Sequence, residues 1–229
     1  MPPINLPQNI SEREYLFITE VGSRMWGMED ISSDYDLFFC YRTPASVYLR
    51  TGNFDATRPQ QKFNHDGKEF DCQFMEIGHL IHLLMKGNVN AIWAVCSPIV
   101  HQSSDTRLEL KDLVERQLSK DSYPSILGMA TSQFKDAEKR AEVRGKEKSL
   151  ATCVRTLNFG LALLNGRGCD FSPYWDATPE RCKQSFDDLE KAMFASTLPV
   201  HPRYDLFTDF LLAVRCIELE SHILTRLAL

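Results

Sequence analysis

The spacing of hydrophobic residues changes near residue 76, and this change predicts where strands give way to helices. The apolar segment 15–21 is typical of a short strand that ends at Gly22-Ser23. Tyr35–Tyr41 is aromatic and apolar throughout, which suits a buried strand. Segment 68–74 alternates, which predicts a third strand with Glu69, Asp71 and Gln73 on one face and Phe70, Cys72 and Phe74 on the other. The stretch 24–33 predicts a short turn or helix plus loop, and 43–67 predicts a long loop with at most a short element.

Beyond residue 76 the pattern is helical. Ile77, Leu80, Ile81 and Leu84 fall on one helical stripe that Gly87-Asn88 ends, and a second apolar segment covers 91–96. Further helices are expected at 105–119, 124–144, 146–164, 179–196 and 205–228. The pattern therefore predicts an α+β protein in two domains, an α/β unit at 1–104 and an all-helical unit at 105–229.

The amino-acid composition limits the classes of protein to which this chain can belong. The 229 residues are 43% hydrophobic and 25% charged, which is ordinary for a globular chain. No apolar run reaches the roughly 18 residues that a membrane-spanning helix needs, so no membrane partner is expected. The first residues lack a basic and then apolar leader, and we expect a cytoplasmic protein.

Charge and cysteine usage exclude further classes. The net charge of −5 excludes a bulk polyanion binder, so any nucleic-acid contact would need a local basic patch. The seven cysteines include no CxxC pair, which favours free thiols over a disulfide framework or a zinc–thiolate site.

Two acidic residues mark the start of the second predicted strand. Asp34 and Asp36 are two positions apart, so a strand would turn both carboxylates to the same side. Such carboxylates repel one another unless a cation offsets their charge, and Mg²⁺ prefers hard oxygen ligands that it can share with phosphates. Gly22-Ser23 ends the preceding strand, where glycine permits close approach and serine and backbone N–H groups can hold a phosphate.

A third carboxylate comes from the next strand. Asp71 lies between Phe70 and Cys72 but on the opposite face, and Glu69 shares that face and is its rival. Three carboxylates would allow two metal ions about 4 Å apart, one activating a hydroxyl and one stabilising a leaving phosphate. SDYD alone is also a common surface turn, so the prediction depends on the combined order and spacing of these motifs.

Together, Gly22-Ser23, Ser33-Asp34-x-Asp36 and Asp71 resemble the motif of the DNA polymerase β-like nucleotidyltransferase superfamily. The longer strings GSRMWG…SDYDLFF and LLMKGNVNAIWAVCSP resemble one branch, the RNA-repair-associated RlaP family. The resemblance covers about 15–100 and extends more loosely to 168. Val89 replaces a proline, Trp26 replaces a frequent tyrosine, and Trp93 stands where a glutamate is often found.

The resemblance implies a small mixed β-sheet with flanking helices. It also implies Mg²⁺- or Mn²⁺-dependent transfer of a nucleoside monophosphate from an NTP such as ATP to an acceptor, an RNA end in RNA repair or tRNA processing. The metal-binding and catalytic carboxylates carry over to Asp34, Asp36 and Asp71. The phosphate-holding turn carries over to Gly22 and Ser23, with Arg24 and Ser33 beside it. The identity of the NTP, the acceptor and the oligomeric state stay open.

The predicted helical unit contributes two cationic residues that are candidates for binding phosphate groups. Lys148 and Arg155 are seven residues apart, so they share a helix face and could neutralise a triphosphate. Related two-domain nucleotidyltransferases use a helical domain to close the cleft and supply such a lysine. The competing interpretation is a solvated helix with charge pairs of modest worth.

Other sequence features give weaker evidence about function. His79 and His82 are three apart without further ligand spacing, so a metal site is not favoured there. Tyr174 and Trp175 could stack a base, but packing under a loop is favoured. The rival functions are a non-catalytic nucleotide- or RNA-binding module and a HEPN-like helical RNase, for which Arg215 and His222 have the R-x6-H spacing.

Overall fold

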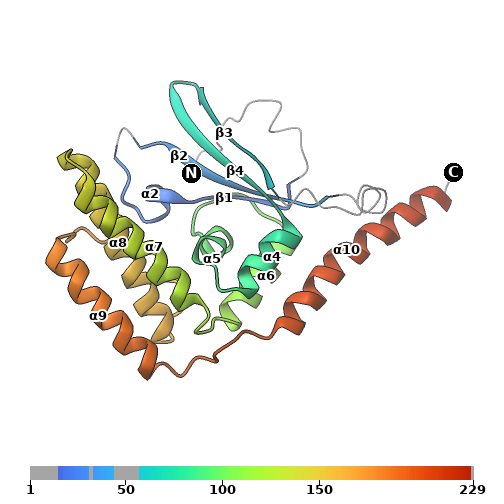
Figure 1. Ribbon diagram of the computed structural model, residues 1–229. Helices are drawn as coiled ribbons and strands as arrows, with labels where there is room; N and C mark the ends of the chain where they lie inside the picture. The colour runs from blue at the N-terminus through green and yellow to red at the C-terminus, as the bar shows by residue number, and fades with distance from the viewer. Residues whose placement is uncertain (1–14, 31–32, 44–56, 228–229) are drawn as a thin grey trace.

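Strands from the first half of the chain form one mixed sheet that helices cover on one face (Figure 1). The structure, a computed structural model, describes residues 15–30, 33–43 and 57–227, with only the backbone of 57–59 and 216–227. Within these residues the sheet has the order β3-β4-β2-β1-β5. Its strands are β1 (Phe17–Glu20), β2 (Tyr35–Tyr41), β3 (Thr57–His65), β4 (Lys68–Glu76) and β5 (Val100–Gln102). Only β2 and β4 run parallel among the pairs formed.

The three predicted strands are confirmed, and two others were not predicted. β3 lies in the segment expected to be a loop, where the polar run Gln60–Lys62 and Pro59 hide the strand signal. An edge strand needs pairing on one side only and so tolerates both features. β5 is only three residues long and lies at the opposite edge.

The predicted helices are confirmed within a few residues. They are the short α2 (Gly22–Met25), α4 (Ile77–Met85), α5 (Val89–Cys96), α6 (Asp105–Arg116), α7 (Ser122–Lys139), α8 (Val143–Leu164), α9 (Pro179–Ala195) and α10 (Tyr204–Leu227). Side-chain caps explain several starts, because Glu76, Asn88, Ser104 and Thr178 each accept a hydrogen bond from a backbone N–H of the first turn.

The start of α5 explains a departure from the family pattern. Val89 is the first residue of this helix, where proline is favoured because its missing N–H needs no helical partner. Here the N–H of Val89 donates to Oγ of Ser125 on α7, at 2.9 Å. A proline could not make this bond, so valine at this position ties α5 to α7.

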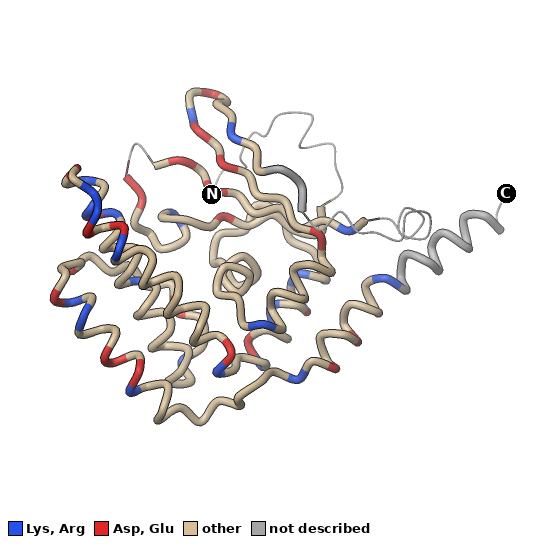
Figure 2. Tube along the Cα trace, viewed as in Figure 1, with Lys and Arg blue, Asp and Glu red and all other residues tan. Residues whose placement is uncertain are grey.

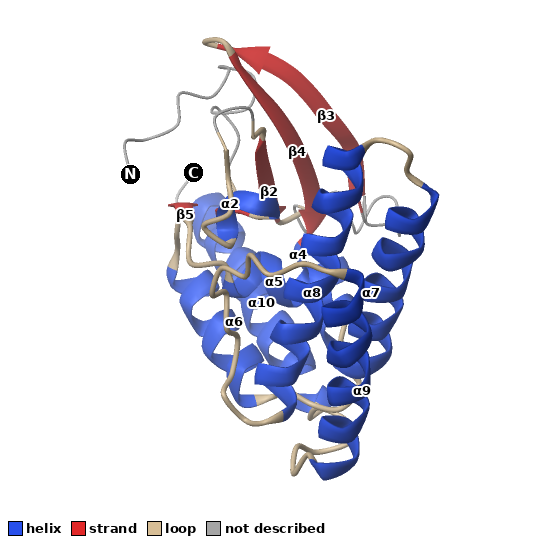
Figure 3. Cartoon of the chain, turned by 90° about the vertical axis from the view of Figure 1, so that its left-hand side faces the viewer, coloured by secondary structure: helices blue, strands red, loops and turns tan. Residues whose placement is uncertain are grey.

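The two faces of the sheet belong to different hydrophobic clusters. Phe38 and Cys40 of β2 face the described helices, and Leu37 and Phe39 pack on the other face with Phe70. Figure 3 shows the helices gathered below the sheet on the first of these faces. That helical cluster contains residues from both sides of position 104, so one continuous core joins the two predicted domains. The two-domain division at this position stays a prediction.

Two composition-based expectations can be followed further. Within the described residues, no helix is long and apolar enough to cross a membrane. Cys40, Cys72, Cys96, Cys153, Cys169 and Cys182 are free thiols, as expected, and the side chain of Cys216 lies outside the described part.

Candidate active site

The parallel pairing of β2 and β4 brings two of the predicted carboxylates together. Asp36 and Asp71 are directly paired Cα positions in this register. Paired residues of adjacent parallel strands project to the same face, which here is the helix-covered one. Asp34 precedes Asp36 by two residues, just before β2 begins. The fold thus gathers Asp34, Asp36 and Asp71 at one end of two neighbouring strands.

In the turn between β1 and β2, Gly22 lies in close contact with the carboxylate of Asp36. Gly22 has a φ of +70°, and a β-carbon there would collide with the carboxylate of Asp36. The N–H of Val21 also donates to the backbone carbonyl of Asp36, at 2.8 Å. Glycine is therefore required for both the backbone conformation and the close approach.

Burial, and to a smaller extent neighbouring carboxylates, perturb the pKa of Asp36. Burial raises the pKa of Asp36 from 3.8 to about 6, with the charges of Asp34 and Asp71 acting in the same direction and smaller effects of Lys148 and Lys62 opposing them. Carboxylate oxygens that repel one another are the donor set of a hard divalent cation. The residues present therefore fit Mg²⁺ or Mn²⁺ by their chemistry.

Asp71 already has cationic and amide partners from β3. The ammonium group of Lys62 lies 2.9 Å from Oδ2 of Asp71, and the amide of Gln60 donates to its Oδ1. Asp71 is only 7% exposed. Glu69, the rival third carboxylate, is exposed and pairs with Asn64 of β3. The register therefore favours Asp71 over Glu69, while Gln60 and Lys62 were missed because their strand was not predicted.

Within the described residues, no three acidic, histidine or cysteine side chains stand close enough together to hold a metal ion as they are. For the carboxylate trio, the pairing of Asp71 with Lys62 shows that a positive charge already offsets one member. Lys62 would have to move for Asp71 to share a metal ion.

A cavity of about 710 Å³ lies between the β1–β2 turn and the start of α8. It is lined by Ser23, Ser33 and Asp34 from one side, by Lys148 and Arg155 from α8, and by Trp175. The two cations that sequence spacing selected therefore face the same cavity as one predicted metal ligand.

Arg155 is unusual among the cations of this cavity because it is 9% exposed. One guanidinium N–H₂ donates to Oγ1 of Thr152 at 3.1 Å, whereas the buried Nε has no hydrogen-bond partner. Burial lowers the pKa of Arg155 to about 10, and the negative charge of Asp36 opposes this shift. A buried guanidinium with an unused N–H donor is suited to an anionic ligand.

Ser33 and Arg24 differ in their placement. The hydroxyl of Ser33 accepts from the N–H of Asp30 at 2.9 Å, and Arg144 of α8 lies 3.0 Å from the same aspartate. Arg24, in contrast, does not line the cavity of about 710 Å³. It does not line the second, smaller cavity beside Asp36 either, which is described below. Its role in phosphate binding stays a prediction without support from its position.

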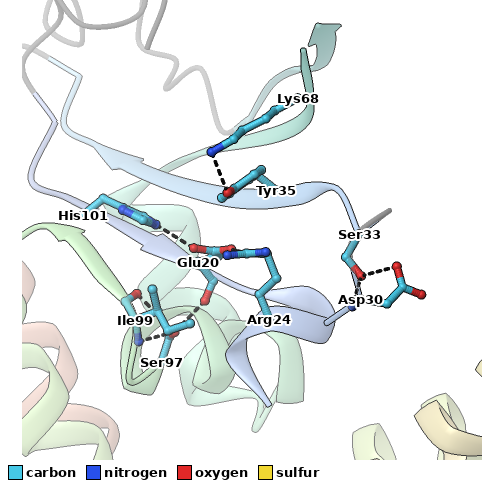
Figure 4. A network of polar contacts seen from close by, with 9 residues as sticks. All are labelled: Glu20, Arg24, Asp30, Ser33, Tyr35, Lys68, Ser97, Ile99 and His101. Carbon is cyan, nitrogen blue, oxygen red and sulfur yellow. Dashed lines mark hydrogen bonds and ion pairs between the residues drawn. The ribbon is translucent and has the colours of Figure 1, made fainter. Parts of the chain in front are cut away.

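Arg24 instead belongs to a network that crosses the ends of β1 and β2 (Figure 4). It forms an ion pair with the fully buried Glu20, which His101 also contacts at 2.8 Å. Its guanidinium lies 4.2 Å from the ring centroid of Tyr35, whose hydroxyl accepts from Lys68 at 3.0 Å. This network anchors α2 and with it the glycine-serine turn.

A second cavity, of about 380 Å³, adjoins the same motif. Gly22 and Asp36 border it, together with Gln73 of β4 and Asn88, Asn90 and Trp93 around α5. Ser23 and Asp34 border the larger cavity, so consecutive motif residues face different cavities. The pattern KGNVN is visible in the sequence, but only the fold places its asparagines near Asp36.

Two further expectations can be compared with the structure. Tyr174 packs partly buried against the core, as expected, whereas Trp175 is 69% exposed and lines the larger cavity. The packing interpretation is therefore wrong for Trp175. Arg215 forms an ion pair with the buried Glu76 and donates to the carbonyl of Thr43 at 2.9 Å, which gives it a structural role. The side chain of His222 lies outside the described part.

Several basic residues lie where α7 ends and α8 begins, and one of them, Lys148, lines the larger cavity. Figure 2 shows these lysines and arginines interspersed with acidic residues at that corner. Lys139, Arg140, Lys146 and Lys148 are exposed there. Glu138, Glu142 and Glu147 are exposed among them, so this corner carries charges of both signs and nucleic-acid contact there stays a prediction.

A comparison with protein-family models agrees with the motif. The model of the family described as "RlaP: RNA repair pathway DNA polymerase beta family" matches residues 7–168. Among solved structures, the chain matches a nucleotidyltransferase-like protein from Exiguobacterium sibiricum 255-15 at 14% identity, covering 95% of this chain and 72% of that one, with a TM-score of 0.36. That similarity is too low to bear on the site. No curated protein matches the sequence.

Proposed function

Because the chain belongs to the RNA repair pathway DNA polymerase beta family, we propose that it transfers a nucleoside monophosphate from an NTP to an acceptor hydroxyl at an RNA end. The observation that carries this proposal is the pairing of Asp36 with Asp71 across β2 and β4, with Gly22 packed against Asp36. This arrangement places carboxylates beside a turn that can approach a phosphate closely.

The larger cavity supplies the groups that an NTP needs. Lys148 and Arg155 would offset the charge of the triphosphate, with Arg155 offering a planar fork and Lys148 a point charge. Ser23 and the N–H groups of its turn would hold phosphate oxygens. Trp175 presents an exposed aromatic surface on the same cavity and would stack on the nucleobase.

The reaction forms one bond and breaks one. The acceptor hydroxyl oxygen bonds to the α-phosphorus, the bond from that phosphorus to the bridging oxygen breaks, and pyrophosphate leaves with the electron pair. Asp71 would receive the hydroxyl proton. Asp34, Asp36 and Asp71 would hold Mg²⁺ or Mn²⁺, which when bound supplies charge stabilisation to the phosphates and lowers the pKa of the acceptor hydroxyl. The protein's own contribution is positioning and electrostatics.

Label transfer from an NTP carrying a radioactive α-phosphate tests this function. We expect Asp34→Ala combined with Asp36→Ala to abolish Mg²⁺-dependent transfer to a panel of RNAs with defined ends. The matched control is Asp187→Ala with Glu190→Ala, which removes two carboxylates from the outer part of α9. Transfer that survives the first pair, or is lost equally in the second, would refute the proposal.

A non-catalytic nucleotide- or RNA-binding module is the second candidate. The ion pair between Lys62 and Asp71 favours such a module, because a carboxylate that is paired with an ammonium group is not available to a metal ion. NTP binding without pyrophosphate release, over the whole RNA panel and with either metal ion, would identify such a module.

A further inference from the structure

The two cavities that border the aspartate motif differ in the chemistry of the residues that line them. Among the residues that line the smaller one, Asp36 alone carries a charge. The other polar groups are the amides of Gln73, Asn88 and Asn90 and the indole N–H of Trp93, which is buried without a hydrogen-bond partner. The larger cavity carries Lys148 and Arg155 together with several carboxylates. The cations among the two linings, Arg144, Lys148 and Arg155, all belong to the larger cavity, so we place the triphosphate there, and the smaller cavity suits an uncharged group.

The amides of the smaller cavity are available for recognition. Oδ1 of Asn88 accepts from the N–H of Ala91 at 3.1 Å, which leaves its NH₂ group as a donor. Gln73 and Asn90 are exposed, and each amide offers both a donor and an acceptor. Met75 adds apolar surface, and so does the small part of Trp93 that is not buried, since this side chain is 8% exposed. Amides beside an apolar wall match the edge and the face of a nucleobase.

We propose that the smaller cavity is the acceptor subsite and binds the uncharged base and ribose of the acceptor's terminal nucleoside. This inference rests on the proposed function, because it assigns the two reactants of that reaction to the two cavities that border the aspartate motif. Phosphoryl transfer needs the attacking and leaving oxygens roughly in line. The two cavities share no lining residue, yet Gly22 and Asp36 border one and Ser23 and Asp34 border the other, so a reactant in each would lie beside the same motif.

The three tryptophans of the chain provide a direct readout. Trp93 lines the smaller cavity, Trp175 lines the larger one, and Trp26 lines neither. We would label the full chain with fluorotryptophan, assign the resonances by single Trp→Phe substitutions, and add each probe separately. Tripolyphosphate with Mg²⁺ is expected to shift the Trp175 resonance. The four ribonucleosides, added after tripolyphosphate, are expected to shift the Trp93 resonance.

Amide-to-leucine variants test which side chains recognise the nucleoside. Gln73→Leu and Asn90→Leu each remove hydrogen bonds at an exposed position, so the fold should survive. We expect each to weaken the nucleoside response of Trp93 about tenfold, as the loss of roughly 1.4 kcal/mol implies, and to leave the Trp175 response unchanged. The matched control Gln184→Leu, exposed on α9 and outside the lining of both cavities, should change neither response.

The outcomes separate this inference from the proposed function. If tripolyphosphate shifts Trp175 but no nucleoside shifts Trp93, the acceptor subsite is refuted and the nucleotidyltransferase proposal survives. If complete NTPs shift Trp93 in a base-dependent way and nucleosides add nothing, the smaller cavity holds the base of the NTP and our assignment is wrong. If neither probe binds and no NTP is consumed, the proposed function itself fails.

Discussion

Gly22 packs so closely against the carboxylate of Asp36 that a β-carbon on residue 22 would overlap this side chain and force it to move. The contact joins the end of β1 to the start of β2, and it places the glycine-serine turn directly beside the predicted metal ligands. Since Gly22 also has a positive φ, both backbone conformation and space constrain it.

We therefore expect Gly22→Ala to displace Asp36 and to abolish nucleotidyl transfer. Gly27→Ala is the matched control, because Gly27 also has a positive φ, of +62°, but a β-carbon added to it would meet no atom within 4 Å. The control should lose only the backbone contribution of about 1 kcal/mol of unfolding free energy, and Gly22→Ala should lose clearly more. Chemical denaturation of both variants measures the difference, and equal losses would contradict the close contact.

The raised pKa of Asp36 predicts a pH-dependent cost in stability. The folded state keeps the proton until about pH 6, whereas the unfolded state releases it near 3.8. Between these values the folded state binds more protons, so stability falls as pH rises through this window, by an amount of order 2 kcal/mol after allowance for solvent screening of this partly exposed group. Asp36→Asn should remove this cost and raise the unfolding free energy at pH 7 in EDTA, while abolishing transfer.

Below about pH 4 the stability gain of Asp36→Asn should disappear, because the wild-type carboxyl is then protonated in both states. Mg²⁺ should stabilise the wild type at pH 7 and have little effect on the variant. A variant that is less stable than the wild type at pH 7, or equally responsive to Mg²⁺, would contradict the assignment of Asp36 as a buried carboxylate beside other negative charges.

Lys62 should compete with metal ions for Asp71. Lys62→Met removes the ammonium that contacts Asp71, so the metal-free variant should be less stable at pH 7. Mg²⁺ should then raise its melting temperature more than that of the wild type, because a cation replaces the missing charge. Lys111→Met, which removes a lysine from an ion pair on the surface of α6, serves as the control. Equal changes in melting temperature on addition of Mg²⁺ in all three proteins would show that Lys62 does not compete with metal ions for Asp71.

Arg155 should contribute to triphosphate binding more than to stability. Its buried Nε lacks a partner, so Arg155→Met removes an uncompensated polar group and should leave the unfolding free energy unchanged or higher. Binding of tripolyphosphate with Mg²⁺, measured by calorimetry, should weaken by about tenfold or more, as for loss of a charge-assisted hydrogen bond. Lys146→Met, also on α8 but outside the cavity lining, should bind normally. Unchanged binding by Arg155→Met would exclude the residue from the site.

Arg215 should act through stability and not through catalysis. Arg215→Ala leaves the fully buried Glu76 without its cationic partner, so it should cost of order 3 kcal/mol of unfolding free energy. Double substitution to Arg215→Met and Glu76→Gln should recover part of that loss. A nuclease activity that Arg215→Ala eliminates while the fold is retained would instead support the HEPN-like interpretation.

Local sequence determined much of the fold. The apolar run Tyr35–Tyr41 fixed β2, and the helical stripe with its Asn88 and Thr178 caps fixed the helix starts, because these signals depend on neighbours along the chain. β3 escaped prediction because its stability comes from pairing with β4 and not from its own polar sequence.

The residues of the candidate site also fall into two groups, those that local sequence selected and those that only the tertiary structure brought together. Sequence spacing alone selected Asp34, Asp36, Gly22, Lys148 and Arg155, because the motif and the helical period are local properties. Only tertiary structure decided that Asp71 pairs with Asp36, that Lys62 contacts Asp71, that Arg24 belongs to Glu20, and that Asn88 and Asn90 border the aspartate motif. These relationships depend on strand register and on the packing of distant segments, and both are set by the burial of the whole core.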